Sequence, residues 1–207
     1  MFMNAELTFL FIIEVIGTIA FAISGIRMAA AKHFDWFGAY TVGLVTAIGG
    51  GTLRDILLGI PVFWMQTWWY LAVTGLSLFI VIAFKKILVK TQILFIFDTI
   101  GLGLFVVIGI QKTIAADYPF WVAVIMGVIT GALGGVIRDI LVNNEPLLFQ
   151  KDIYATACFA GGIVYWIMSL TGASQLAQGL ACAAVVILIR ILAVRFSWSL
   201  PVLNQNE

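Results

Sequence analysis

The sequence has few charged residues. Asp, Glu, Lys and Arg make up 10% of the 207 residues, whereas soluble globular chains carry about 25%. Because 63% of the residues are hydrophobic and the mean hydropathy is +1.12, the composition indicates a membrane protein. The net charge of +1 leaves no basic stripe, and this argues against nucleic acid as a partner.

Cysteine and histidine are also scarce. Cys158 and Cys182 lie in apolar segments without CxxC spacing, so we expect buried thiols rather than a disulfide or a metal pair. His33 stands alone, without other ligand residues nearby. No Ser/His/Asp, metal-ligand or phosphate-loop pattern is visible, so the sequence predicts a protein that is not an enzyme and needs no cofactor.

Long apolar runs dominate the chain. A helix that crosses a bilayer needs about 20 apolar residues. Hydropathy predicts an all-α polytopic membrane protein with seven transmembrane helices, at 7–30, 36–59, 68–86, 92–113, 119–142, 153–171 and 175–196. Pro61 and Pro146 follow the second and fifth spans, because proline cannot continue a helix. The first run lacks a basic start and a cleavage site, so we expect a retained helix.

The distribution of Lys and Arg predicts the orientation. With the amino terminus outside, only Lys112 falls on the outer side, and Arg54 and Arg138 fall within spans. The other basic residues fall on the inner side: Arg27, Lys32, Lys85, Lys86, Lys90, Lys151, Arg190 and Arg195. The positive-inside rule therefore places the amino terminus outside and the carboxyl terminus in the cytoplasm, for a multi-pass protein of the bacterial inner membrane.

An internal repeat relates the two halves of the chain at a constant offset. The stretch from Gly43 to Leu57 recurs from Gly127 to Leu141, and at the same offset Glu14 falls on Asp98. Each unit holds three spans, so the second enters the membrane from the opposite side. We expect two inverted three-helix repeats plus a seventh helix, divided as 1–90, 91–172 and 173–207.

The repeated motif places glycines inside helix-length apolar runs, where glycine weakens a helix. One interpretation is close helix packing. The other is a kinked or broken helix whose free carbonyls line a water-filled path. Two threonines precede the glycines and either line that path or bond to their own helix. The residues concerned are Thr46, Gly49, Gly50 and Gly51 in the first copy and Thr130, Gly134 and Gly135 in the second.

Charged residues inside the spans need partners, because an unpaired charge in lipid is costly. Each arginine is followed by an acid, as Arg54-Asp55 and Arg138-Asp139. Since Glu14 lies toward the same side as Arg54, and Asp98 toward the same side as Arg138, we predict ion pairs or water-bridged pairs Glu14–Arg54 and Asp98–Arg138. These pairs either face an aqueous cavity or are purely structural.

The duplicated Gly-Gly-Gly-Thr-Leu-Arg-Asp and Gly-Gly-Val-Ile-Arg-Asp motifs, the Glu14…Gly17 and Asp98…Gly101 openings and the seven spans resemble the prokaryotic branch of the trimeric intracellular cation (TRIC) channels. That bacterial family also includes a member described as a glycine transporter. The resemblance implies a homotrimer with one pore per protomer, lined by the kinked second and fifth helices together with the first and fourth. It also implies monovalent cations, with K⁺ favoured, as permeant ions. Membrane lipid is a further expected partner, because Lys85, Lys86 and Lys90 form a predicted inner loop that attracts anionic lipid.

The sequence leaves three functions open. The first is a potassium-permeable channel, in which backbone carbonyls and polar side chains replace the hydration shell of the ion. The second is a secondary transporter of a small zwitterion such as glycine, since inverted repeats with glycine-broken helices are typical of transporters and arginine binds carboxylates. The third is a structural protein without a permeation path, which would tolerate substitution of Arg54 and the glycines.

Overall fold

The computed structural model describes residues 5–84 and 91–201. Its elements are helical, apart from one isolated bridge between Asp152 and Ser199. The long helices are α1 (Ala5–Ala31), α2 (Trp36–Leu58), α6 (Thr91–Ala115), α7 (Phe120–Leu141) and α9 (Gln175–Arg195). The shorter ones are α3 (Phe63–Gln66), α4 (Trp69–Ala83), α8 (Ala155–Leu170) and the 3₁₀ helix η1 (Leu147–Phe149).

The ends of the helices follow local sequence signals. Asp35 caps the start of α2, where its Oδ1 accepts a hydrogen bond of 2.7 Å from the backbone N–H of Gly38. The helix ends at Leu58 because Gly59 takes a left-handed φ of 67°, a conformation that glycine adopts at low cost. Ser174 caps α9 in the same way as Asp35, by accepting from the N–H of Ala177.

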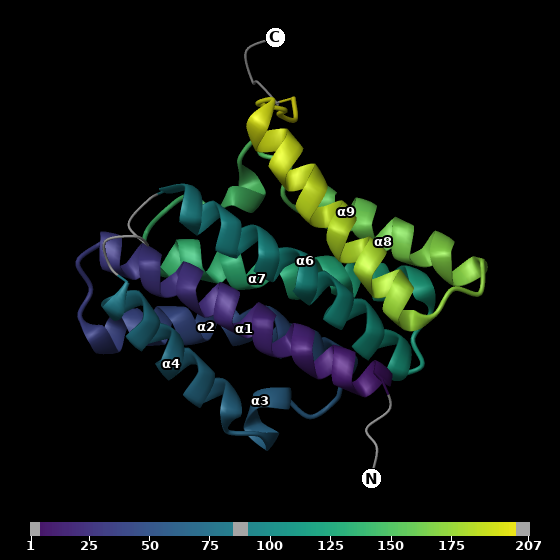
Figure 1. The fold of residues 1–207 in the computed structure, drawn as a ribbon, viewed down its shortest axis with the longest axis horizontal. Helices are drawn as coiled ribbons and strands as arrows, with labels where there is room; N and C mark the ends of the chain where they lie inside the picture. Colours follow the sequence, from purple (N-terminus) through teal and green to yellow (C-terminus); the bar gives the residue numbers. More distant parts are fainter. Residues whose placement is uncertain (1–4, 85–90, 202–207) are drawn as a thin grey trace.

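Four helices form the centre of the molecule. Helices α1, α2, α6 and α7 make the most extensive contacts, in the pairs α1–α2, α6–α7, α1–α6 and α2–α7. Helix α4 packs against α1 and α2, and α8 and α9 pack against each other and against α7 and α6, respectively. Figure 1 shows α3 and α4 on one side of this core and α8 and α9 on the other.

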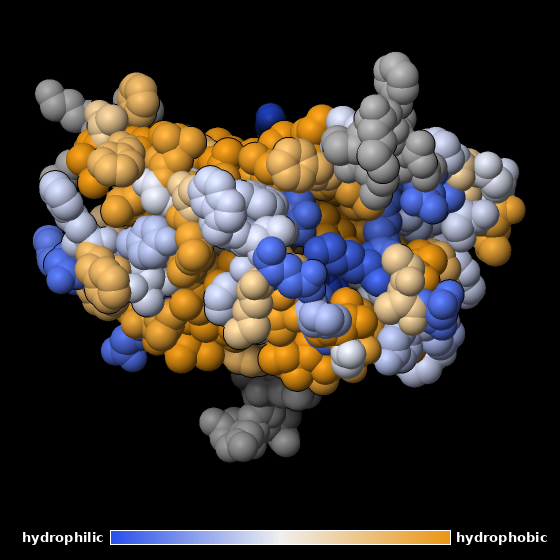
Figure 2. Space-filling model, turned by 90° about the horizontal axis from the view of Figure 1, so that it is seen from below, coloured by the Kyte–Doolittle hydropathy of each residue, from blue (hydrophilic) through white to orange (hydrophobic). Residues whose placement is uncertain are grey.

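All seven predicted spans coincide with helices. Five of them, α1, α2, α6, α7 and α9, are long and apolar enough to cross a membrane. The third and sixth spans correspond to α4 and α8, which have 15 and 16 residues and are shorter than predicted. The predicted inner loop with Lys85, Lys86 and Lys90 lies outside the described residues. Hydrophobic residues cover much of the face in Figure 2, with hydrophilic ones gathered near its middle.

The glycine-rich helices are not broken. Helix α2 is continuous from Trp36 to Leu58 and α7 from Phe120 to Leu141, so both run through their glycine clusters. A break at the glycines is therefore absent from this conformation, while the kink stays a prediction.

The glycines have another use, because they let α2 and α7 approach each other at backbone distance. A Cβ atom on Gly50 would overlap the carbonyl oxygen of Thr130, and one on Gly134 would overlap that of Thr46. A backbone carbonyl cannot move aside as the end of a flexible side chain can. The structure therefore supports close helix packing, the first of the two interpretations of the glycines.

Candidate permeation site

Two cavities with charged residues in their linings lie at the core helices. The Arg138 cavity has a volume of about 380 Å³, and its charged lining residues are Asp98, Arg138, Asp139, Glu145, Asp152 and Arg190. The Lys112 cavity has a volume of about 400 Å³, and its charged lining residues are Glu14, Asp55 and Lys112. The two cavities share no lining residue. Most of the charged residues predicted within the spans therefore gather at two separate places.

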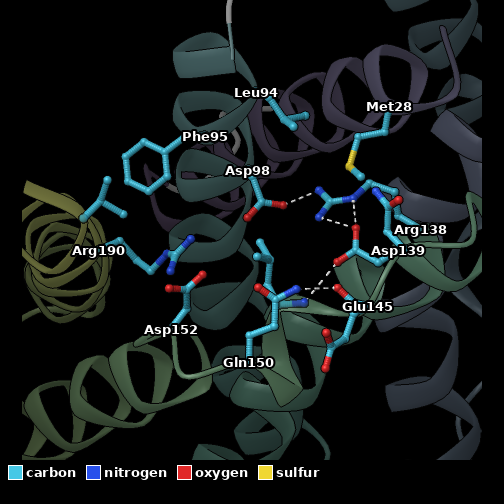
Figure 3. Close-up of a pocket in the computed structure, with 13 residues that line it drawn as sticks. Met28, Leu94, Phe95, Asp98, Arg138, Asp139, Glu145, Gln150, Asp152 and Arg190 are labelled. Atoms are coloured by element: carbon cyan, nitrogen blue, oxygen red, sulfur yellow. Dashed lines mark hydrogen bonds and ion pairs between the residues drawn. The ribbon is translucent and has the colours of Figure 1, made fainter. Parts of the chain in front are cut away.

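The predicted pair of Asp98 and Arg138 is present in the Arg138 cavity. Arg138 Nη1 bonds to Asp98 Oδ1 and also donates to Ser24 Oγ at 2.6 Å. Its Nε and Nη2 contact Asp139 Oδ1 at 2.9 and 2.8 Å. Figure 3 shows Asp98 from α6 and Asp139 from α7 on either side of the guanidinium. Because the three groups are buried, the two acids neutralise a charge that would otherwise be very costly.

The predicted pair of Glu14 and Arg54 is wrong. Glu14 Oε1 accepts from Lys112 Nζ at 3.0 Å, while Arg54 bonds through Nε and Nη2 to Asp55 Oδ1 at 2.8 and 2.6 Å. The repeat explains the difference, because the residue that corresponds to Lys112 in the first half is Met28. The Lys112 cavity thus has a cation where the Arg138 cavity has a methionine, and that cation takes the carboxylate of Glu14.

The acid that follows each arginine also fixes the chain beyond the helix. Asp55 Oδ2 accepts from the N–H of Phe63 at 2.9 Å, and Asp139 Oδ2 accepts from the N–H of Leu147 at 3.3 Å. Phe63 and Leu147 are themselves corresponding positions of the repeat. Each Arg-Asp pair thus joins the end of a core helix to the segment that closes one cavity, a role that the sequence reasoning missed.

Two phenylalanines, Phe21 on α1 and Phe105 on α6, lie between the cavities. Their rings are tilted against each other with centroids 5.1 Å apart, and both side chains are buried. Positions seven apart in a helix share a face and lie about 10 Å apart along it. Residues at this spacing on either side of each ring line one cavity or the other: Glu14 and Met28 around Phe21, and Asp98 and Lys112 around Phe105. The two rings therefore lie between the residues that line one cavity and the residues that line the other.

Two glycines of the repeat make room for the ring of Phe21. An ideal Cβ atom on Gly101 would overlap the ring of Phe21, and one on Gly134 would lie 3.3 Å from it. Both positions therefore leave no room for a side chain beside the ring. The remaining glycines of the motif face other side chains: Gly49 faces Ile137, Gly51 faces Phe63, and Gly135 faces the Tyr154 hydroxyl.

The two threonines of the motif bond to their own helices. Thr46 Oγ1 donates to the carbonyl of Val42, and Thr130 Oγ1 to that of Met126, each at 2.6 Å. Both side chains are buried. Of the two interpretations of these hydroxyls, the structure supports the bond to the helix rather than the lining of a path.

The remaining polar residues do not form a metal site. Within residues 5–84 and 91–201, no group of three or more His, Cys, Asp or Glu side chains is placed to hold a metal ion. Cys158 and Cys182 are buried free thiols, as predicted.

Arg190 lines the Arg138 cavity, a placement that the sequence reasoning missed. Its position on α9 carries no motif, so hydropathy and spacing offered no signal for it.

The sequence of this chain is similar to those of bacterial membrane proteins. The family described as "Glycine transporter" matches residues 11–86 and 95–169, two segments that begin at corresponding positions of the repeat. The UPF0126 inner membrane protein YadS of Escherichia coli K12 is 39% identical over 199 residues, covering 94% of this chain and 96% of that protein.

Solved structures agree with the sequence relatives. The TRIC trimeric intracellular cation channel orthologue from Rhodobacter sphaeroides superposes with a TM-score of 0.87 at 29% identity, covering 92% of this chain and 99% of that one. A second solved structure, described as giving the structural basis for conductance through TRIC cation channels, has a TM-score of 0.84 at 33% identity. The match covers 95% of this chain and 98% of that one.

Proposed function

Because this chain belongs to the bacterial membrane-protein family described as "Glycine transporter", and its fold is that of the bacterial TRIC cation channels, we propose that it is a channel for monovalent cations. K⁺ is the proposed permeant ion. The proposal excludes enzymatic activity, since the polar residues of the core are used in pairing and in lining cavities.

One observation carries the proposal: two cavities with charged linings lie on either side of the contact between two buried aromatic side chains. The path runs from the Lys112 cavity, past the contact of Phe21 with Phe105, to the Arg138 cavity. Apolar constrictions close ion paths because water leaves them, and an ion does not cross without water. The conformation described here is therefore the closed one.

The charges near this path suit a cation. Arg54 is neutralised by Asp55, and Arg138 by both Asp98 and Asp139. The Arg138 cavity has four carboxylates in its lining against two arginines. An excess of carboxylates in a cavity raises the local concentration of cations, so this end of the path attracts K⁺.

We further propose seven spans arranged as two inverted units, 1–90 and 91–172, with residues 173–207 as the last span and tail. Contacts that recur at the offset of the repeat support this arrangement. They include the Arg-Asp pairs, the bonds to Phe63 and Leu147, and the approach of Gly50 to Thr130 and of Gly134 to Thr46. The amino terminus is proposed to lie outside and the carboxyl terminus in the cytoplasm.

The proposed assembly is a homotrimer in the inner membrane, with one path in each protomer and membrane lipid around and between them. The support comes from relatives, since the Rhodobacter protein is described as trimeric and YadS as an inner membrane protein. Light scattering on the purified protein in detergent tests it. A mass of one protomer under conditions that preserve the fold would contradict the trimer.

Reconstitution in planar bilayers under asymmetric KCl and NaCl tests the channel. We expect discrete unitary currents that reverse near the K⁺ equilibrium potential and change in amplitude when Arg54 is replaced by Ala. Silent bilayers, with protein that is folded and oriented in parallel vesicles, would overturn the proposal.

A secondary transporter of a small zwitterion such as glycine is the second candidate, because the matching family carries that description. Alternating access would then open the two cavities in turn. Saturable, concentrative uptake of labelled glycine into proteoliposomes, without unitary currents, would favour it. Linear currents without saturable uptake would favour the channel.

A further inference from the structure

Arg190 on α9 holds a buried charge that lacks an acidic partner. It is 2% exposed, and its guanidinium lies over the ring of Tyr154, 4.8 Å from the centroid. Nη1 donates to the carbonyl of Ile153 at 2.9 Å. Among the described residues no carboxylate lies within ion-pair distance of this guanidinium, and its Nε has no hydrogen-bond partner. Since arginine stays protonated, the buried Nε calls for an acceptor.

Asp98 on α6 has the complementary need in the same cavity. Its Oδ1 is taken by Arg138, while its Oδ2 is buried and has no partner in the part of the chain that the structure describes. Figure 3 shows Asp98 between Arg138 and Arg190, with the second carboxylate oxygen on the side of Arg190. A buried donor and a buried acceptor are both costly when unpaired. These two groups therefore suit each other.

Asp152 is the other acid that Figure 3 shows near Arg190, and its need for a partner is smaller. Asp152 is half-buried, so its carboxylate keeps contact with water. Its oxygens are not among the buried atoms without a partner, whereas Asp98 is 2% exposed. Asp98 is therefore the acid that gains more from Arg190.

The two arginines lie on opposite sides of Asp98. Arg138 belongs to α7 and also donates to Ser24 Oγ at 2.6 Å, so the oxygen of Asp98 that is paired lies toward α1. Arg190 belongs to α9, which packs against α6. A change of partner from Arg138 toward Arg190 therefore moves Asp98 away from α1.

The same movement separates the aromatic closure. At Gly103 the backbones of α6 and α9 approach so closely that a Cβ atom would lie 3.2 Å from the carbonyl oxygen of Ala183, so α6 turns more easily than it shifts toward α9. Asp98 and Phe105 are seven residues apart and share one face of α6. A turn that carries Asp98 toward α9 therefore carries Phe105 away from Phe21.

We propose that Arg190 is a positioning residue for the opening of the path. It pairs with Asp98 Oδ2 when α6 turns, and this pair holds Phe105 away from the closed contact. Arg138 stays neutralised by Asp139 during the turn. The inference rests on the proposed channel function, and it gives α9, the helix without a counterpart in the repeat, a role in opening.

Single-channel recording at high KCl tests this role, because screening there reduces the effect of removing a charge from the cavity. Arg190→Met should lower the ratio of open to closed time by about tenfold or more, since the open state loses a charged hydrogen-bonded pair. The unitary current should stay the same. Arg190→Lys keeps a charge and should restore part of the ratio. If Arg190→Met does not fold, Arg190→Gln removes the charge but keeps a donor and should change the ratio in the same direction.

Combined variants separate the pair from a general structural effect. In Asp98→Asn protein, Arg190→Met should lower the ratio by less than about twofold, because its partner is already gone. In Asp152→Asn protein the full effect should remain. In Phe105→Ala protein the closure is already lost, so Arg190→Met should leave K⁺ flux unchanged. Arg195→Met removes an exposed arginine from the same helix and should leave the ratio unchanged.

Three outcomes in a conducting protein would overturn this inference alone. They are normal opening of folded Arg190→Met, the same loss of flux with and without Phe105→Ala, and a full effect of Arg190→Met in Asp98→Asn protein. Silent wild-type protein would instead overturn the channel, and the role of Arg190 in opening with it.

Discussion

The rings of Phe21 and Phe105 touch at the point where the two halves of the chain meet, with centroids 5.1 Å apart. Each lies one heptad from a carboxylate on its own helix, Phe21 from Glu14 and Phe105 from Asp98. The pair thus sits midway between two cavities that both contain charge. Its position makes the packing of α1 on α6 the contact that would control the proposed path.

Replacing either phenylalanine by alanine should raise K⁺ flux in proteoliposomes. The change removes the apolar contact that excludes water from the path, and it should also lower the free energy of unfolding by about 3–5 kcal/mol, as expected for a buried aromatic. Phe79→Ala serves as the control, because Phe79 is 69% exposed. Unchanged flux in folded Phe21→Ala and Phe105→Ala would place the closure elsewhere.

Adding a methyl group at the crossing of α2 and α7 should destabilise the protein. Gly50→Ala and Gly134→Ala would each put a Cβ atom against a backbone carbonyl oxygen, which cannot move aside easily. The expected cost is about 1–3 kcal/mol each, seen as a lower unfolding temperature in detergent. Gly75→Ala, whose nearest neighbour is 4.0 Å away, should be neutral or stabilising by about 0.5–1 kcal/mol.

The two acidic residues that correspond in the repeat should differ in importance. Asp98→Asn removes one of the two acids that neutralise the buried Arg138, and we expect a loss of about 3–5 kcal/mol. Glu14→Gln breaks a pair in which Lys112 is 30% exposed, and we expect about 1 kcal/mol or less. Thermal unfolding of both variants in one detergent measures the difference. Equal losses would contradict the assignment of partners.

Lys112→Met should increase cation conductance at low salt. The substitution gives the Lys112 cavity the residue that Met28 supplies to the Arg138 cavity, and it leaves Glu14 without its cation. A more negative entrance attracts cations, and screening reduces this effect as ionic strength rises. Single-channel amplitudes at low and high KCl measure it. An increase that is the same at all salt concentrations would require an explanation other than charge.

Labelling of single cysteines tests the proposed orientation. Thr67→Cys, near the Lys112 cavity, should react with an impermeant maleimide from the outside, and Glu145→Cys, at the Arg138 cavity, only from the cytoplasmic side. Both positions are exposed, while the native Cys158 and Cys182 are buried and should not react. The reverse pattern would invert the topology.

Hydropathy and repeat spacing predicted much of the architecture. The seven predicted spans match helices because long apolar runs in this chain are separated by clear signals, such as Asp35 before α2 and Gly59 after it. The pair of Asp98 and Arg138 followed from placing both residues toward the same end. The helix break that was one interpretation of the glycines is absent from the structure. A helix can stay continuous when its glycines let a neighbouring backbone approach closely.

The contacts that were missed depend on which face of a helix each residue occupies. Hydropathy places Lys112 at the outer end of its span without saying which way it faces, although its spacing of seven from Phe105 puts it on the face that looks toward Glu14. Phe21 and Phe105 are matching positions in the repeat, but matching positions do not reveal that the two rings meet. Arg190 belongs to α9, which has no counterpart in the other half, so no internal comparison pointed to it.

Gly50 packs against the backbone carbonyl of Thr130, and Gly134 packs against that of Thr46. Each half of the chain therefore shapes the surface on which the other half packs. In each half a glycine leaves a space beside its helix, and a backbone carbonyl of the other half fills that space. Neither half of the chain could therefore fill the space beside its own glycine if the other half were removed.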